Sequence, residues 1–470
     1  MSIAWPGRLP TQDHSGAVAA AAWGFLAAGA AFAVLAPPLF WLLLAGTAAL
    51  AVVFLCYRHT VIACTAWVLI AGATLEMAIG DLFGPPLPQL IIALVKAAQV
   101  GLAAVCVVRF GPAADPFNPA LAFAAMGLVG FVRGLHPGLA AGDSLRSLAG
   151  SMAPYVFSFS VLSLPWSRAI IGMVRWIPIL TVAGGAVLDA AGLRPLFIDL
   201  GGNRLGAMGH PAFLGGFCQT AIYASLIELL RDGRRREIAL MAVSFVLLTA
   251  TGARAPLLYA TAVCLLAMLF VPSARLGWRR RLTLLLAGAA ALPVLLALAG
   301  ELGGLRLFHV LADQDASDLS GRQVLWPIFE DAAARSPWFG WGVGAGNAVI
   351  PVTSDVALLI GTLAAHNEYL RIRVEGGWVG LGLLIGCFVG WVWMHTRVLR
   401  LTDRVIMRMV FVAFACHAFT DNLLISTSAC VLFSFVAAVF ARGALERRAA
   451  NAKPAAPAMI QADDGARILA

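Results

Sequence analysis

Apolar runs of about 15 to 22 residues recur along the whole chain, separated by short loops rich in Gly, Pro and Arg. An α-helix rises about 1.5 Å per residue, so runs of this length are typical of helices that cross a hydrocarbon core about 30 Å thick. Backbone polar groups inside a bilayer must be satisfied within the protein, which favours helices over open strands. We therefore predict an all-α polytopic membrane protein with about 12–14 transmembrane helices. The predicted spans are 17–35, 39–56, 61–80, 88–108, 118–132, 150–164, 169–189, 211–230, 237–251, 255–271, 282–299, 378–395, 405–419 and 423–441.

Composition strengthens this assignment. Hydrophobic residues make up 61% of the 470 and charged residues only 12%, against roughly 25% charged residues in a soluble domain. The mean hydropathy is +0.87. The formal charge of +9 would favour nucleic acid in a soluble protein, but in a membrane protein the positive-inside rule accounts for it. We expect contact with membrane lipid and no nucleic acid partner.

The arginines set the predicted orientation, because their loops fall on one side of the predicted spans and that side should be cytoplasmic. Both termini are then cytoplasmic: residues 1–16, which lack the pattern of a cleaved signal, and the tail 442–470, which we expect to be disordered. The eight cysteines lie in or beside apolar runs, without the spacing of a disulfide framework or metal site, so no cofactor is predicted. The basic clusters surround Arg231, Arg275, Arg400 and Arg442.

Polar segments collect on the opposite, external side. The longest stretch without a convincing span is a large loop at about 300–365, and long loops between membrane helices are more often functional than plain connectors. The same side receives GNRLGAMGHP (202–211), TGARAP (251–256) and HAFTDNLL (417–424). Several separate segments thus bring polar groups to one membrane surface, which favours a site there.

Two arginines in these segments have both a structural and a functional interpretation. Arg254 lies where arginine is under-used, next to a sharp turn, yet an arginine at a helix end is commonly a snorkelling anchor. Arg322 could pair with the aspartates of the nearby run DQDASD (313–318). That run itself resembles a metal-binding carboxylate cluster, but it lacks the Gly and closing Glu of a calcium loop.

The stretch AHNEYLRIRVEGGWVG (365–380) is unusually charged for this chain. On an uninterrupted helix His366 and Arg373 would share a face and Glu375 would point away, with Arg371 and Glu375 forming a local ion pair. His366 is left as the group that can exchange a proton near neutral pH. The glycines that follow, at 376, 377 and 380, permit close helix packing. Lys96, one of two lysines, lies within an apolar span, where a charge is a functional candidate; it could face the same cavity.

Taken in order, TGAR, SGR with a following Trp, SPWFGWGVGAGN and HNEYLRIRVEGGWVG resemble the signature of the O-antigen ligase and Wzy-type polymerase superfamily of C-type membrane glycosyltransferases. The resemblance covers about residues 200–440. It implies a core at 201–441, including the periplasmic loop 300–365, preceded by N-terminal transmembrane helices at 17–200.

The resemblance also implies an activity: transfer of a glycan from undecaprenyl diphosphate to lipid A-core or to a growing polysaccharide, on the periplasmic side of the bacterial inner membrane, without a metal. His366 matches the catalytic histidine. Arg254 and Arg322 match the arginines expected to bind the diphosphate, and Arg204 resembles a further basic position. The supporting residues are Lys96, Arg373, Glu375, which resembles a structural acid, and Asp421, near the acceptor or His366.

Several activities stay open at this point. A ligase and a polymerase share the signature, and a related branch of protein O-oligosaccharyltransferases glycosylates proteins. A transporter of polysaccharide or lipid-linked oligosaccharide would also have many helices and an intramembrane lysine, but should show two similar halves and charges near the midplane. Neither feature is evident in the sequence.

Overall fold

The computed structural model describes residues 37–84, 87–199, 203–301, 322–351, 353–360 and 363–452, together with residues 23, 24 and 29. The chain divides into two compact units, 1–59 and 60–470. The first contains helix α2 (Pro37–Arg58). The expected terminus 1–16, residues 453–470 of the expected tail 442–470, most of the predicted span 17–35 and the DQDASD run lie outside the described residues. Residues 442–452 of that tail belong to helix α18 (Thr427–Ala452), so the expected disorder is wrong for them.

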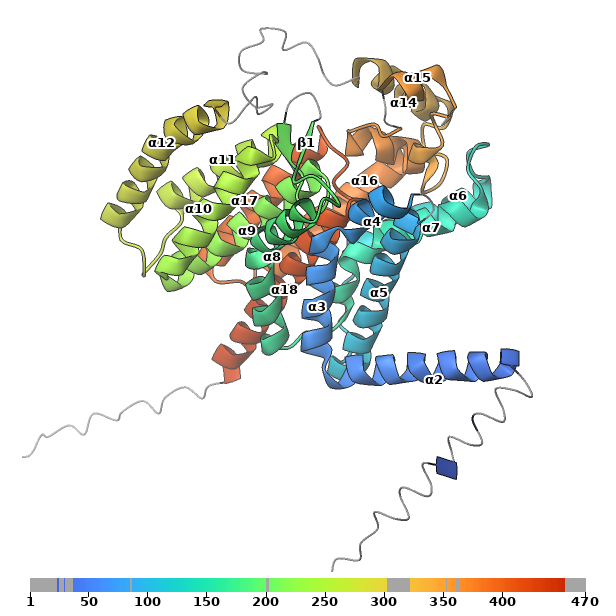
Figure 1. The fold of residues 1–470 in the computed structure, drawn as a ribbon, viewed down its shortest axis with the longest axis horizontal. Helices are drawn as coiled ribbons and strands as arrows, with labels where there is room; N and C mark the ends of the chain where they lie inside the picture. The colour runs from blue at the N-terminus through green and yellow to red at the C-terminus, as the bar shows by residue number, and fades with distance from the viewer. Residues whose placement is uncertain are drawn as a thin grey trace, which may run out of the picture. The chain divides into compact units, whose positions relative to one another are not determined.

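The second unit is built almost entirely of helices (Figure 1). Its first half contains α3 (Thr60–Ala73), α4 (Leu75–Phe83), α5 (Leu87–Phe110), α6 (Pro119–Arg133), α7 (Ala141–Met152), the 3₁₀ helix η1 (Ala153–Phe159), α8 (Leu164–Ala190) and an antiparallel hairpin of β1 (Phe197–Asp199) and β2 (Asn203–Leu205). Its second half contains α9 (Pro211–Asp232), α10 (Arg235–Ala250), α11 (Arg254–Phe270), α12 (Trp278–Glu301), α14 (Arg322–Arg335), the 3₁₀ helix η2 (Ala345–Asn347), α15 (Asp355–Ile360), α16 (Glu368–Thr396), α17 (Leu401–Ala418) and α18 (Thr427–Ala452).

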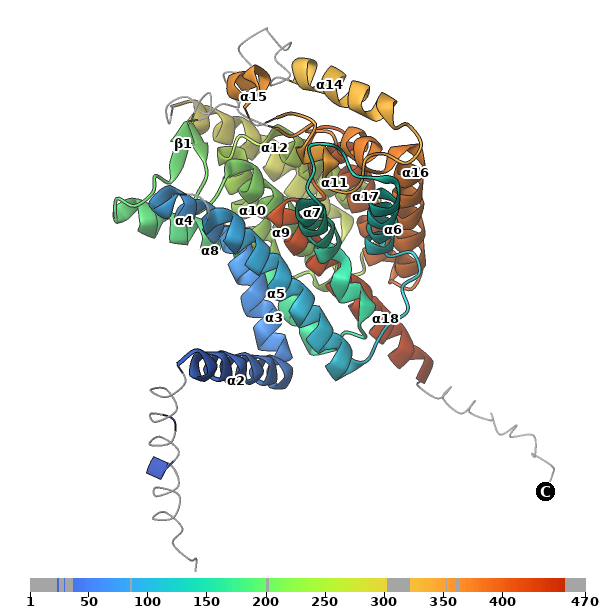
Figure 2. The same cartoon turned by 90° about the vertical axis from the view of Figure 1, so that its right-hand side faces the viewer.

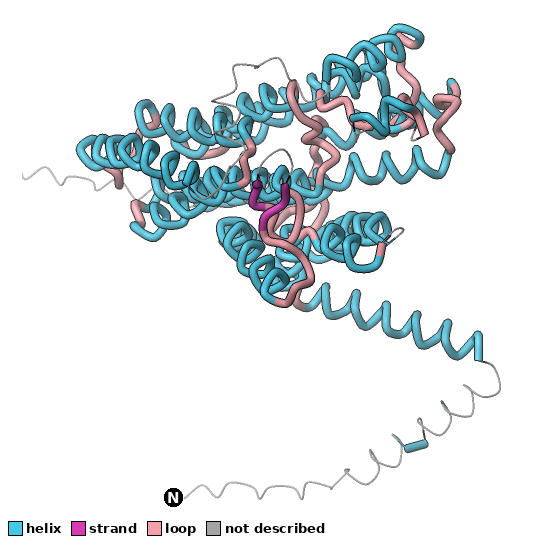
Figure 3. Tube along the Cα trace, turned by 45° about the horizontal axis from the view of Figure 1, so that its top comes forward, coloured by secondary structure: helices cyan, strands magenta, loops and turns pink. Residues whose placement is uncertain are grey.

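The protein is an all-α polytopic membrane protein, as the sequence predicts. Within the described residues, five helices are long and apolar enough to cross a membrane by themselves: α5, α8, α9, α16 and α18. Helices α6 and α11 are apolar but shorter. The small hairpin is visible in Figure 3 as the pair of strands among the helices. The total of about 12–14 crossings stays a prediction.

Two predicted spans are not continuous helices. The run 61–80 breaks at Thr74, whose left-handed conformation (φ 48°, ψ 44°) separates α3 from α4. The predicted span 150–164 is instead the end of α7 followed by η1, with Pro154 in the first turn of η1. The backbone at the end of η1 forms hydrogen bonds with the segment that follows α5. Ala113 N donates to Phe159 O (2.8 Å), and Val161 N donates to Gly111 O (2.9 Å). These partners replace the bonds of a longer helix.

The Gly-aromatic segment SPWFGWGVGAGN docks against a kink in α16. Gly377 has φ 62° and interrupts the helix, and a Cβ on it would lie 2.3 Å from the backbone carbon of Trp338. The kink leaves backbone groups for the incoming segment: Trp341 N donates to Val374 O, and Trp378 N to Pro337 O (2.9 and 2.8 Å). The close glycine packing predicted from the sequence is therefore confirmed.

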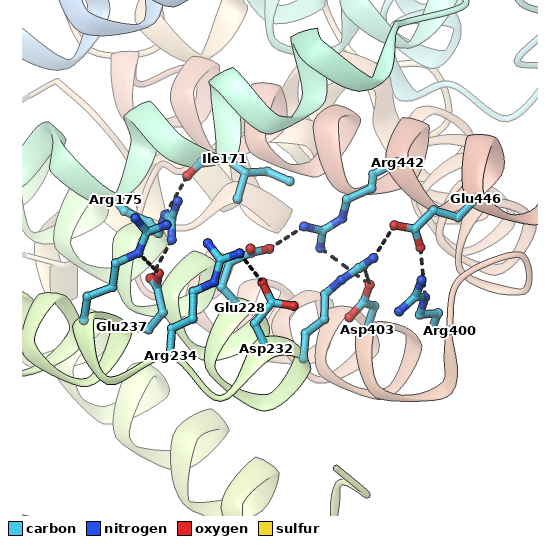
Figure 4. A network of polar contacts seen from close by, with 12 residues as sticks. Ile171, Arg175, Glu228, Asp232, Arg234, Glu237, Arg400, Asp403, Arg442 and Glu446 are labelled. Carbon is cyan, nitrogen blue, oxygen red and sulfur yellow. Dashed lines mark hydrogen bonds and ion pairs between the residues drawn. The ribbon is translucent and has the colours of Figure 1, made fainter. Parts of the chain in front are cut away.

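A network of ion pairs joins the C-terminal parts of α9 and α18 to the N-terminal part of α17 (Figure 4). Arg231 bonds Asp403 (2.9 Å) and Glu446, joining α9 to α17 and α18. Arg442 pairs with Glu228 and lies 3.5 Å from Asp403. Three of the four predicted basic clusters, those around Arg231, Arg400 and Arg442, thus meet at one end of the helices. The polar motifs described next lie at the other ends of α9, α17 and α18.

Candidate active site

His366 lies just before α16, in a strained position. It has φ 48°, a left-handed conformation that is costly for a residue with a Cβ and that recurs at functional sites. The next residue, Asn367, caps α16 by accepting a hydrogen bond from Leu370 N (3.1 Å). On the other side Trp326 of α14 donates its indole N–H to Ala365 O (2.9 Å). Two helices therefore fix the backbone around His366, whose side chain is about one-third exposed.

Asp421 reaches His366 from the break between α17 and α18. Its Oδ1 lies 3.5 Å from His366 Nδ1 and accepts a bond from Asn422 N (2.8 Å), while its Oδ2 lies 3.8 Å from His417 Nε2. Burial alone would raise the pKa of Asp421, but the bond to His366, the charge of His417 and the Asn422 N–H together hold this pKa below its ordinary value. Asp421 is thus a carboxylate that can orient His366, one of the two neighbours that the sequence suggests for it.

Arg322 and Arg254 stand beside this pair. Arg322 Nη2 donates to Thr420 O (2.8 Å), next to Asp421, and its charge interacts with those of Asp421 and Arg254. Burial lowers the pKa of Arg322, with Arg254 acting in the same direction and Asp421 opposing it. Arg254 is the first residue of α11. Its helix N-terminus adds a positive partial charge, so the two arginines together favour an anion.

Arg204 joins the group through the hairpin. It lies on β2, and its Nε donates to Thr251 O (2.8 Å) in the turn between α10 and α11. Figure 2 shows the hairpin at the same end of the molecule as α14. Three cationic side chains from segments far apart in sequence therefore belong to one cluster, with Arg322 near Asp421, Arg254 near Arg322 and Arg204 bonded to the turn before α11.

Two histidines that the sequence reasoning did not single out also lie here. His210 caps α9, since its Nδ1 accepts a bond from Ala212 N (3.2 Å). Burial, with the nearby positive charge of Arg204, lowers the pKa of His210, whereas Asp421 opposes that shift. His417 is buried and packs its ring against Tyr259, 5.6 Å between centroids. Both lie within the polar segments 202–211 and 417–424, so their position beside those motifs was the available signal.

The remaining predicted residues lie elsewhere. His366 is not in the helix, so it does not share a helical face with Arg373; Arg373 instead stacks over the Trp378 ring, 4.2 Å from its centroid. Glu375 is buried and accepts a bond from Arg371 (2.8 Å), which confirms the predicted ion pair. Lys96 donates to Ile425 O (3.1 Å) and lines a separate cavity with Arg371 and Glu375.

Glu368 is a further residue that the sequence reasoning missed. It is buried, and its two carboxylate oxygens accept bonds from Leu424 N and Arg371 Nε, both at 2.6 Å. Through these bonds Glu368 ties the loop that carries Asp421 to the helix that follows His366. Its role is positioning, because it places the two halves of the candidate site relative to each other.

Comparison with known proteins now bears on this cluster. Residues 239–385 match the family model described as O-Antigen ligase. Over these residues the chain is similar to that family. The matched range contains Arg254, Arg322 and His366, while Arg204 and Asp421 lie outside it and reach the same place through the fold. A search of curated proteins finds no match.

The described residues include no group of three or more His, Cys, Asp or Glu side chains arranged to hold a metal ion. The cationic groups around Asp421 are arginines, which are permanently charged and hold phosphate oxygens in bidentate pairs. The arrangement can therefore combine a proton acceptor, a carboxylate that orients it and an anion-binding surface.

Proposed function

We propose that this protein is a membrane glycosyltransferase that moves a glycan from undecaprenyl diphosphate to an acceptor hydroxyl, as an O-antigen ligase or a polysaccharide polymerase. The observation that carries the proposal is the His366–Asp421 pair (3.5 Å) surrounded by Arg204, Arg254 and Arg322. The similarity to the O-antigen ligase family over residues 239–385 supports the same class of activity.

His366 acts as the general base in this mechanism. Asp421 faces Nδ1 of the imidazole, which favours the tautomer with its proton on Nδ1 and leaves Nε2 as the accepting nitrogen. As the acceptor oxygen attacks the anomeric carbon, its proton passes to Nε2 and the resulting imidazolium is stabilised by Asp421. The bond from the anomeric carbon to the diphosphate oxygen breaks with its electron pair going to the diphosphate. Attack from the opposite face inverts the anomeric configuration.

The arginines stabilise the leaving group. A lipid diphosphate gains negative charge as the glycosidic bond breaks, and guanidinium groups already in place stabilise that charge without reorganising. Arg254 and Arg322 fill this role, each at the first described residue of a helix, and Arg204 adds a third cation from the hairpin. Because arginine charge suffices for this task, the mechanism uses no metal.

The site faces the periplasm of the bacterial inner membrane in this account. The basic clusters around Arg231, Arg400 and Arg442 meet at one end of the helices, and the positive-inside rule assigns that end to the cytoplasm. The site lies at the opposite end. His210 is at the N-terminus of α9, His417 is in the last turn of α17, and Asp421 is in the turn before α18. A lipid-linked donor would then meet its acceptor on the external surface.

The test is a reconstitution in liposomes with undecaprenyl-diphosphate-linked glycan, with and without lipid A-core, and with the products separated by size. A ladder without lipid A-core identifies a polymerase, and a product that requires lipid A-core identifies a ligase. Transfer to a supplied protein would identify the protein-glycosylating branch. Passage of intact donor across the bilayer without any new glycosidic bond would contradict the proposal and favour a transporter.

A further inference from the structure

A cavity with both polar and apolar lining residues lies on the other side of the Asp421 loop. It measures about 500 Å³ and opens between α5, α7 and α16. Its polar lining includes Lys96, Arg146, Ser147, Asn347, Arg371 and Glu375. Ile425, four residues after Asp421, also lines it and accepts the bond from Lys96. The loop 421–425 therefore lies between this cavity and the His366 site.

One buried donor in this cavity lacks an acceptor within the described chain. Arg371 is 4% exposed and is held by Glu368 and Glu375 through Nε and Nη1, but its Nη2 has no hydrogen-bond partner among the described residues. Lys96 has three N–H groups and makes one described side-chain hydrogen bond, to Ile425 O. A buried donor without an acceptor costs about 1–3 kcal/mol, more when it is charged, so such groups call for a bound acceptor.

The charge of the lining favours an anion. Three of its side chains are cationic and one, Glu375, is a carboxylate. Arg371 is paired with two carboxylates, Glu368 and Glu375, so this triad does not supply positive charge. The positive charge of the lining comes from Lys96 and Arg146; Arg146 is exposed and only loosely paired with Asp143 (3.6 Å). The α5 wall also presents apolar side chains, among them Ile92, Ala93 and Val100. A phosphate attached to a lipid matches both surfaces.

We propose that this cavity binds the phosphate of the lipid-anchored acceptor, with Lys96, Arg146 and the unpartnered Nη2 of Arg371 as its ligands. The inference rests on the proposed transferase function and gives it a second substrate site. Donor and acceptor phosphates then lie on opposite sides of the loop 421–425, so the two lipids use different sets of cationic side chains.

Lipid stoichiometry tests the proposal directly, with undecaprenyl monophosphate as the probe and native mass spectrometry of the full chain as the readout. We expect two lipids per wild-type chain and one in Lys96→Gln/Arg146→Gln. Arg254→Gln/Arg322→Gln should also retain one lipid. The variant that combines all four substitutions should bind no lipid. The apparent Kd at the second site should rise by roughly tenfold or more when a charged partner is lost. Arg335→Gln, an exposed arginine on α14, is the matched control and should keep two.

The single variant Arg146→Gln distinguishes loss of binding from loss of folding. It changes an exposed side chain and should still weaken binding of the second lipid. A wild-type chain that binds one lipid, unaffected by the Lys96 and Arg146 substitutions, would overturn the inference and leave the proposed function standing. Two lipids that persist when Arg254 and Arg322 are changed would instead count against the proposed donor site.

Competition then identifies the acceptor and guards against general lipid contact. Displacement of only the Lys96-dependent lipid by lipid A supports a ligase-type acceptor at this cavity. Retention of that lipid in the presence of lipid A supports a second polyprenyl-linked glycan, and so a polymerase. If phosphatidylglycerol at the same concentration displaces it as well as lipid A does, the cavity is an ordinary lipid contact and the proposal is wrong.

Discussion

His366 Nδ1 lies 3.5 Å from Asp421 Oδ1, although 55 residues separate the two in sequence. The distance is long for a hydrogen bond, and such bonds between catalytic groups commonly shorten when substrate binds. Asp421 should therefore matter most during the transfer step, when His366 carries the proton.

Asp421→Asn tests this relationship. An amide can still occupy the space but cannot stabilise an imidazolium, so we expect kcat to fall by roughly 10²–10⁴-fold while KM for the donor changes little. Steady-state transfer kinetics would measure the split. Asp331→Asn, an exposed carboxylate on α14, should leave both constants unchanged. A normal kcat in Asp421→Asn would remove Asp421 from the mechanism.

Arg322→Lys tests the diphosphate contact. Lysine keeps the charge but loses the planar pair of donors that holds two phosphate oxygens, so we expect transfer to fall by roughly 10²-fold. The matched control is Arg335→Lys, on the same helix and away from the cluster. Near-normal turnover in Arg322→Lys would show that charge alone is needed and would contradict bidentate binding.

Chelation tests the metal-independent mechanism. Because arginines supply the positive charge around the leaving group, transfer measured in EDTA should equal transfer in buffer. A second measurement adds a divalent cation back to the EDTA-treated protein. Activity that EDTA abolishes and the cation restores would contradict the account and make the DQDASD run at 313–318 a candidate ligand set.

Gly377→Ala tests the packing that positions the site. The new Cβ would meet Trp338 at 2.3 Å in a backbone conformation that strains alanine, so we expect a loss of about 2–5 kcal/mol in stability. Gly382→Ala in the same helix meets nothing within 4 Å and should stabilise the helix by about 0.5–1 kcal/mol. Thermal unfolding in detergent compares them. Equal stability in the two variants would mean that the docked segment does not hold α16.

Much of this fold follows from hydrophobic periodicity, because a helix in a bilayer is specified by the length of its apolar run. Helices α5 and α9 begin and end within two residues of the predicted spans at 88–108 and 211–230. Hydrophobic periodicity does not predict a helix break where tertiary contacts stabilise the altered backbone. Thr74 adopts a left-handed conformation inside an apolar run, beside the turn at Gly209, and no local pattern indicates this break.

The site was predictable as a set of motifs but not as a geometry. Arg254, Arg322 and His366 were found from their segments, and the structure brings all three close to Asp421. The helical-wheel argument for His366 failed because Asn367 caps α16, so the helix begins at Glu368, two residues after the histidine. From the sequence Lys96 could face the same cavity as His366, whereas in the structure it lines a separate cavity beside the loop 421–425.

The most direct measurement of the central claim is glycan transfer by wild type and His366→Ala, with donor binding determined on the same preparations. The account predicts that transfer falls by roughly 10²–10⁴-fold in His366→Ala while the Kd for the undecaprenyl-diphosphate-linked glycan stays within about twofold, because His366 moves a proton and the arginines hold the donor. Transfer at the wild-type rate in His366→Ala, with donor binding intact, would contradict it.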